Sequence, residues 1–162
     1  MAGDDTDAHI DTLTRFVNTT TITYIKCHDK DDEHYEALKK MEEQLQTFKT
    51  KEGKPYILVP PPMTDAIYNT REERLPATYA NFLITNDALL YSAYSDKNDK
   101  IVHEIFKELF PEKEIIPINC LQLIEQGGSL HCSTMQVAVL ISSCKVLCPI
   151  MCIRSGITLC MC

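Results

Sequence analysis

The sequence predicts an α+β protein with small sheets, because one order of elements, ββαβ, occurs twice along the chain. Each occurrence begins with two short strand-like runs around a turn, continues with an amphipathic helix and closes with a short apolar strand. The chain has 162 residues, of which 44% are apolar, so it is long and apolar enough to bury the core of about one domain.

The first ββαβ unit lies near the N-terminus. Two strand-like runs, 14–17 and 21–25, surround a turn that contains Asn18, a residue that suits tight turns. Apolar residues then recur with helical spacing from 35 to 48, with Glu and Lys on the opposite face. The short apolar run 56–59 is typical of a buried strand and closes the unit.

The second unit repeats this order. Strand-like runs at 81–84 and 88–94 precede a helical pattern at 101–109, and the run 114–118 reads as the closing strand. Residues 60–78 connect the two units and contain three consecutive prolines and a charged stretch. We expect this connection to be a surface loop, and long loops in compact domains are often functional.

Charge and composition argue against a nucleic-acid partner. Sixteen Lys and Arg residues against 23 Asp and Glu residues give a net charge of −7, with a pI of about 5.2. Without a basic cluster, the chain has no electrostatic footprint for nucleic acid. The first residues are acidic and lack the apolar region of a secretory signal, so we expect a cytoplasmic protein.

Cysteine is distributed unevenly along the chain. Three of the eight cysteines, Cys27, Cys120 and Cys132, lie in the first 132 residues, and the other five follow position 143. Without a secretory signal, this pattern favours reduced thiols over a disulfide framework.

Two short segments contain residue types that can carry out chemistry. In an extended backbone His9 and Asp11 point to the same face, and a His beside a carboxylate is a candidate general acid/base. Gly127 and Gly128, which allow a sharp turn or a close backbone approach, precede Cys132, a candidate nucleophile. From spacing alone, a turn and a buried inert thiol remain the alternative for this second segment.

Three segments of the chain are informative together: TDAHIDTLTRFV at residues 6–17, LPATYANF at 75–82 and GGSLHCSTMQ at 127–136. In this order they resemble successive motifs of the agmatine deiminase family, which also includes bacterial peptidylarginine deiminases. The resemblance implies a pentein, a ring of five ββαβ units. Residues 1–136 would then form a partial pentein domain of about two and a half repeats.

The resemblance also implies roles for individual residues. Cys132 matches the family's nucleophile, His9 its general acid/base, and Asp11 a carboxylate that holds the substrate guanidinium. Asn81 and Gly128 lie in matching motifs and are assigned to substrate binding. His131 would point away from Cys132 if both lie on a strand, so we interpret it as a packing or hydrogen-bonding residue.

The implied reaction converts agmatine to N-carbamoylputrescine and ammonia, a step of putrescine and polyamine biosynthesis. It needs no metal and no organic cofactor, and its partner is a small guanidine substrate. A peptidylarginine deiminase and a non-catalytic pentein-like binding or oligomerisation module are the alternatives. A thiol-rich metal or redox protein that acts through the last residues is a weaker one.

The sequence departs from the family pattern in three ways. The family has an N-terminal half that is not present here, so we expect low stability, association with a partner or with itself through an exposed edge, and little or no activity of the chain alone. Ala8 stands where the family has Gly, which would introduce strain of about 1 kcal/mol if that position needs positive φ. Residues 137–162 form a cysteine-rich apolar tail of doubtful fold, too interrupted by charge and proline to span a membrane.

Overall fold

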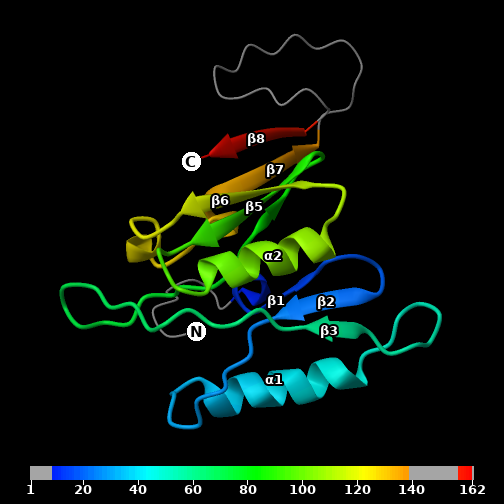
Figure 1. The fold of residues 1–162 in the computed structure, drawn as a ribbon, viewed down its shortest axis with the longest axis horizontal. Helices are drawn as coiled ribbons and strands as arrows, with labels where there is room; N and C mark the ends of the chain where they lie inside the picture. Colours follow the sequence, from blue (N-terminus) through cyan, green and yellow to red (C-terminus); the bar gives the residue numbers. More distant parts are fainter. Residues whose placement is uncertain (1–8, 139–156, 162) are drawn as a thin grey trace.

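The computed structural model describes residues 9–138 and 157–161 (Figure 1). This part of the chain is a mixed α+β fold with two helices and three small sheets, as the sequence predicts for the class. Ala8, where we expect backbone strain, lies outside the described residues. The cysteines at 144, 148, 152 and 162 lie outside them as well.

The first unit follows the predicted order. β1 (Thr14–Phe16) pairs antiparallel with β2 (Thr21–Tyr24), α1 (Tyr35–Thr47) follows, and β3 (Ile57–Val59) pairs parallel with β2. The turn between β1 and β2 is closed by Asn18, whose side-chain oxygen accepts a hydrogen bond of 2.9 Å from the backbone N–H of Thr20. This is the local bond that makes Asn favourable in turns.

The second unit has the same topology. β4 (Leu83–Ile84) pairs antiparallel with β5 (Ala88–Ala93), α2 (Asp99–Leu109) follows, and β6 (Glu114–Asn119) pairs parallel with β5. A parallel pair requires a crossover connection, which the helix provides in both units. In Figure 1 the two units lie one above the other, with α1 at one end of the molecule.

The main hydrophobic core belongs to the second unit. Phe106 of α2 is fully buried between the aromatic rings of Phe82 and Tyr91, each with its centroid 5.3 Å away. Phe110 completes the cluster at 5.9 Å from Phe82. The first unit has smaller clusters, in which Leu38 and Leu45 are the buried residues of α1.

The connection between the units is a surface loop only in part. Residues 71–73 are exposed, but residues 75–80 are buried, and Leu75 and Ala77 join the core of the second unit. The apolar residues in 75–80 are few and follow no helical or strand period. Burial of this segment therefore depends on packing against neighbouring segments and not on a helix or strand of its own.

The C-terminal part contains two 3-10 helices and a strand pair. Ile124–Gln126 and His131–Ser133 are 3-10 helices, and β7 (Thr134–Ala138) pairs antiparallel with β8 (Ile157–Met161). The predicted boundary at residue 136 therefore falls inside β7. The described residues contain two ββαβ units, and β7 with β8 does not establish a third.

Candidate active site

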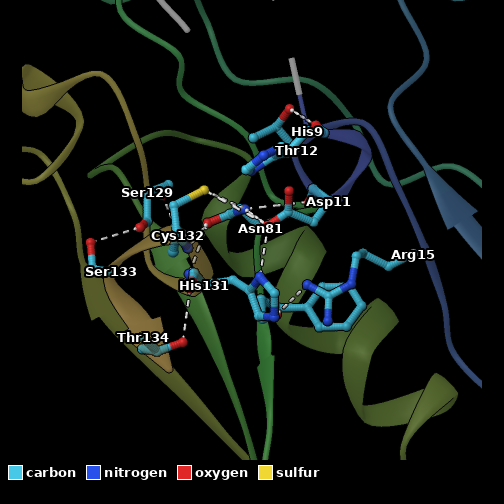
Figure 2. A network of polar contacts seen from close by, with 12 residues as sticks. His9, Asp11, Thr12, Arg15, Asn81, Ser129, His131, Cys132, Ser133 and Thr134 are labelled. Atoms are coloured by element: carbon cyan, nitrogen blue, oxygen red, sulfur yellow. Dashed lines mark hydrogen bonds and ion pairs between the residues drawn. The ribbon is translucent and has the colours of Figure 1, made fainter. Parts of the chain in front are cut away.

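Three segments that are far apart in the sequence meet at one place (Figure 2). Asp11 lies on the 3-10 helix Ile10–Thr12, Asn81 on the turn before β4, and Cys132 on the 3-10 helix His131–Ser133. The first of these helices is closed by Thr12, whose hydroxyl donates to the carbonyl oxygen of His9 at 3.0 Å.

Asn81 joins the other two segments. Its side chain is fully buried, and its Nδ2 donates to Asp11 Oδ2 at 2.9 Å and to Cys132 Sγ at 3.3 Å. Its Oδ1 accepts from the backbone N–H groups of His131 at 2.8 Å and Cys132 at 3.2 Å. Both ends of the amide are therefore bonded within the protein. The geometry gives Asn81 a bridging position between Asp11 and Cys132, and its predicted contact with substrate stays a prediction.

Cys132 faces Asp11, as the motifs predict. The Cys132 thiol donates to Asp11 Oδ2 with an Sγ to oxygen distance of 3.7 Å. The residue is exposed, so the alternative of a buried thiol is wrong.

The glycine pair shapes the loop before the cysteine. Gly127 has a φ of 80°, the left-handed region that glycine adopts without cost, and it ends a 3-10 helix. A Cβ at Gly128 would lie 3.2 Å from the Cβ of Cys132. The predicted turn is present, and the Gly128 backbone lies close to the Cys132 side chain; a close approach to a ligand stays a prediction.

His131 lies on the same side of the loop as Cys132. Its Nδ1 is 2.7 Å from Asp11 Oδ2, the oxygen that also faces the Cys132 sulfur. The prediction that it points away assumed a strand, in which neighbouring side chains are about 180° apart; in a 3-10 helix they are about 120° apart. The expected hydrogen-bonding role is confirmed, and the expected direction is wrong.

The electrostatic environment keeps Asp11 ionised. Burial by itself raises the pKa of Asp11, but the hydrogen bond and charge of His131 and the charge of Arg15 outweigh burial, so the pKa lies below its ordinary value. Asp11 Oδ1 is buried and has no hydrogen-bond partner among the described residues. The carboxylate therefore carries negative charge and has unused acceptor capacity beside an exposed thiol.

His9 lies at the edge of this site. It is exposed and precedes the first 3-10 helix, and Figure 2 shows it beside Asp11, on the side of the Cys132 sulfur. Within the described residues, its imidazole has no hydrogen bond to Asp11 or Cys132. The structure thus brings Asp11 and Cys132 into contact and places His9 next to them.

A network of buried hydroxyl groups connects the loops of the site to β5. Ser129 Oγ is 2.8 Å from Ser92 Oγ and 2.9 Å from the hydroxyl of Tyr94. Tyr94 donates to the carbonyl oxygen of Thr78 at 3.0 Å, and Thr78 Oγ1 donates to that of Thr12 at 2.9 Å. This chain of bonds ties the loops of Cys132, Asn81 and Asp11 to β5. Thr12, Thr78 and Ser129 lie within the three motifs, but no role was predicted for them, because a single hydroxyl residue has no characteristic spacing.

A cavity of about 210 Å³ lies elsewhere in the molecule, between α1 and the residues that follow β2, and it includes Lys26, Cys27 and Glu42. In residues 9–138 and 157–161, no group of three or more His, Cys, Asp or Glu side chains is arranged to hold a metal ion. Neither helix of this described part has the length and apolar character required to cross a bilayer.

Comparisons with known proteins agree on one family. The family model for Porphyromonas-type peptidyl-arginine deiminase matches residues 1–138. A solved structure of a putative arginine deiminase from Porphyromonas gingivalis is 51% identical, with a TM-score of 0.79 over 82% of this chain and 39% of that one. A C. jejuni agmatine deiminase structure with substrate bound is 43% identical, with a TM-score of 0.73 over 81% of this chain and 37% of that one.

A curated relative described as a putative agmatine deiminase, from Marinomonas sp., is 27% identical over 85% of this chain and 42% of its own length. The chain thus spans about two fifths of the length of the relatives that it matches. The family model covers most of the chain, and the predicted family is confirmed. The chain belongs to the Porphyromonas-type peptidyl-arginine deiminase family, which its three motifs predicted.

Proposed function

We propose that this chain takes part in the hydrolysis of a guanidinium group, with agmatine as the substrate and N-carbamoylputrescine and ammonia as the products. The observation that carries the proposal is the contact between the exposed Cys132 sulfur and the ionised Asp11 carboxylate, 3.7 Å apart. Relatives and structural neighbours described as agmatine deiminases support the reaction class. The two ββαβ units support a partial pentein architecture.

The residue types fit the chemistry. A guanidinium is a planar cation, and a carboxylate binds its N–H groups through charge-assisted hydrogen bonds. Asp11 would hold the cation with its central carbon next to Cys132, and a thiolate is a nucleophile soft enough to attack that carbon.

The proposed reaction has two halves. In the first, the Cys132 thiol passes its proton to His9 and the sulfur forms a bond to the guanidinium carbon; His9 then donates that proton to the leaving nitrogen, and the C–N bond breaks to release ammonia. In the second, water gives one proton to His9 and its oxygen bonds to the carbon of the amidino-thioether; the carbon–sulfur bond breaks, the sulfur takes up the remaining hydroxyl proton as the thiol, and the proton on His9 leaves with ammonia as ammonium. The imidazole ends in its starting state, and the product carries oxygen where the substrate carried nitrogen.

Asn81 and Gly128 take supporting roles in this proposal. Asn81 holds Asp11 and Cys132 at a fixed separation, and Gly128 leaves room for the Cys132 side chain. Among the described residues, Asp11 is the carboxylate in contact with Cys132. Because one carboxylate binds only one side of a planar cation, we expect slow turnover by this chain alone.

The test uses the full chain and agmatine. We expect slow release of ammonia, or a covalent adduct of agmatine less ammonia on Cys132, visible by mass spectrometry after acid quenching. Cys132→Ala removes the nucleophile and should abolish both signals, whereas Cys27→Ala, a matched change away from the site, should leave them unchanged. Absence of both signals from the unmodified chain, in a defined oligomer, would contradict the proposal and favour a non-catalytic module.

A peptide substrate is the second candidate, because the matching family model describes peptidyl-arginine deiminases. The same assay with an arginine-containing peptide separates the two. A higher rate with the peptide than with agmatine would assign the chain to peptidylarginine, with Cys132 and Asp11 in unchanged roles.

A further inference from the structure

The two oxygens of Asp11 have different surroundings. Oδ2 accepts from His131 Nδ1 at 2.7 Å and from Asn81 Nδ2 at 2.9 Å, and it faces Cys132 Sγ at 3.7 Å. Oδ1 is buried and has no partner within the described part of the chain. The orientation of the carboxylate is therefore set by bonds to a single oxygen.

His131 is attached to the site at two points. Its backbone N–H donates to Asn81 Oδ1 at 2.8 Å, and its ring bonds Asp11 at 2.7 Å. His131 and Cys132 are consecutive in one 3-10 helix. One short rigid turn thus carries both the sulfur and the group that holds the carboxylate facing it.

The Arg15 guanidinium also favours the ionised form of Asp11, through its charge rather than through a hydrogen bond. The Arg15 guanidinium donates to the carbonyl oxygen of Phe82 at 2.8 Å and lies over the Phe82 ring, 4.9 Å from its centroid. It lowers the pKa of Asp11 through charge, as His131 does through both its hydrogen bond and its charge. Removal of the His131 ring would therefore leave Asp11 beside a fixed positive charge but without its strongest orienting bond.

We propose that His131 is a positioning residue, which acts through Asp11 to align the carboxylate for a cationic amidine or guanidine bound against Cys132. The proposal rests on the proposed function, since it gives a role in cation binding at that same site. His131 does not itself contact the reacting atoms. Its absence should weaken recognition of a planar cation and leave the intrinsic reactivity of the thiol in place.

The experiment uses two alkylating probes of the same shape and different charge. 2-Chloroacetamidine is a planar cation and 2-chloroacetamide is neutral; with either, the sulfur bonds to the CH₂ carbon and chloride leaves. The rate of modification at Cys132 is followed by peptide mass spectrometry and divided by the rate of the same probe with 2-mercaptoethanol. The quotient of the two normalised rates is the cation preference of Cys132, and it does not require turnover.

We expect the unmodified chain to show a clear cation preference, and His131→Ala to lower it about tenfold, the size typical for loss of one good charge-assisted contact. The normalised rate with 2-chloroacetamide should stay within about twofold, which shows that the Cys132 loop is intact. His131→Asn should restore most of the preference, because the Asn amide nitrogen lies at the same bond distance from Cα as Nδ1.

Asp11→Asn separates this proposal from the proposed function. If the unmodified chain shows no cation preference, or if Asp11→Asn leaves it unchanged, cation binding at this site is wrong and both proposals fall. If Asp11→Asn removes the preference while His131→Ala retains it, only the role of His131 is wrong. Equal losses of cation preference in His131→Ala and His131→Asn would also overturn the positioning role of His131, since the Nδ1 contact would then not matter.

Discussion

Individual side chains in this site are held by contacts that leave little freedom. Asn81 is fully buried and has both ends of its amide bonded, and Asp11 and Cys132 converge on it from segments 70 and 51 residues away. A buried amide that loses a partner costs about 1–3 kcal/mol, so the native arrangement is strongly favoured over alternatives.

Gly128 gives a test of this tight packing. Gly128→Ala would place a Cβ 3.2 Å from that of Cys132, so the Cys132 side chain must move by a few tenths of an ångström. We expect a loss of stability of about 1–3 kcal/mol from overpacking, together with slower alkylation of Cys132 by iodoacetamide.

Gly53→Ala is the matched control for that substitution. Gly53 has a φ of 78°, and an added Cβ would meet no atom within 4 Å. It should cost about 1 kcal/mol through backbone strain and leave the Cys132 rate unchanged. If Gly128→Ala leaves the rate of Cys132 alkylation by iodoacetamide unchanged, the loop adapts without moving the sulfur.

At the level of elements, α2 connects the hydrophobic core to the site. Phe106 of α2 packs on Phe82, which directly follows Asn81 and whose carbonyl oxygen accepts from Arg15. The helix therefore fixes the backbone that carries the bridging amide. The first unit lacks a comparable aromatic cluster, which is consistent with its smaller cores.

Phe106→Ala should be among the most destabilising substitutions in α2. Phe106 is fully buried among three aromatic rings, so its truncation leaves a cavity and should cost about 3–5 kcal/mol in the free energy of unfolding. Ile101→Ala, on the same helix at 52% exposure, should cost less than about 1 kcal/mol. Urea titration measures both, and similar losses would show that α2 does not organise this core.

At the level of the whole molecule, ion pairs join segments that the chain separates. Arg74, in the connection between the units, pairs with Asp32 at 2.9 Å and Glu33 at 3.2 Å, just before α1. Asp32 Oδ1 also accepts from the backbone N–H of His34 and lies 2.8 Å from its ring nitrogen. Burial raises the pKa of Asp32, but the bonds from Arg74 and His34 outweigh it and lower the pKa to about 2.

The ion pair between Arg74 and Asp32 predicts that the stability of the fold depends on pH. The pKa of Asp32 is lower in the folded state than its ordinary value of 3.8, so its contribution is full above about pH 4 and disappears as the pH falls through about 2. Arg74→Met should therefore lower the free energy of unfolding by about 1–2 kcal/mol at pH 7, and by less at pH 3.

Urea unfolding at the two pH values checks this prediction. Lys97→Met is the matched control, because its pair with Asp65 is exposed on both sides and should contribute little at either pH. If Arg74→Met lowers the free energy of unfolding equally at pH 7 and pH 3, its effect comes from packing of the side chain and not from the charge on Asp32.

The sequence by itself determined the elements and the residue types of the site. Periodicity of 2 and 3.6 residues located β1, β2, α1, β5, α2 and β6 to within a few residues, because these patterns reflect local backbone geometry. The three motifs identified the family and placed Asp11 and Cys132 in one site before any distance was known.

Only the tertiary structure decided how those residues meet. The contact between His131 and Asp11 joins residues 120 apart, and the direction of the ring depends on a 3-10 helix where local spacing suggested a strand. Burial of Leu75 and Ala77 likewise depends on packing against the second unit. Local sequence patterns do not reveal such contacts, because the contacts form only when separate segments pack together. In the packed site, the direction of a side chain is set by its neighbours and its hydrogen bonds.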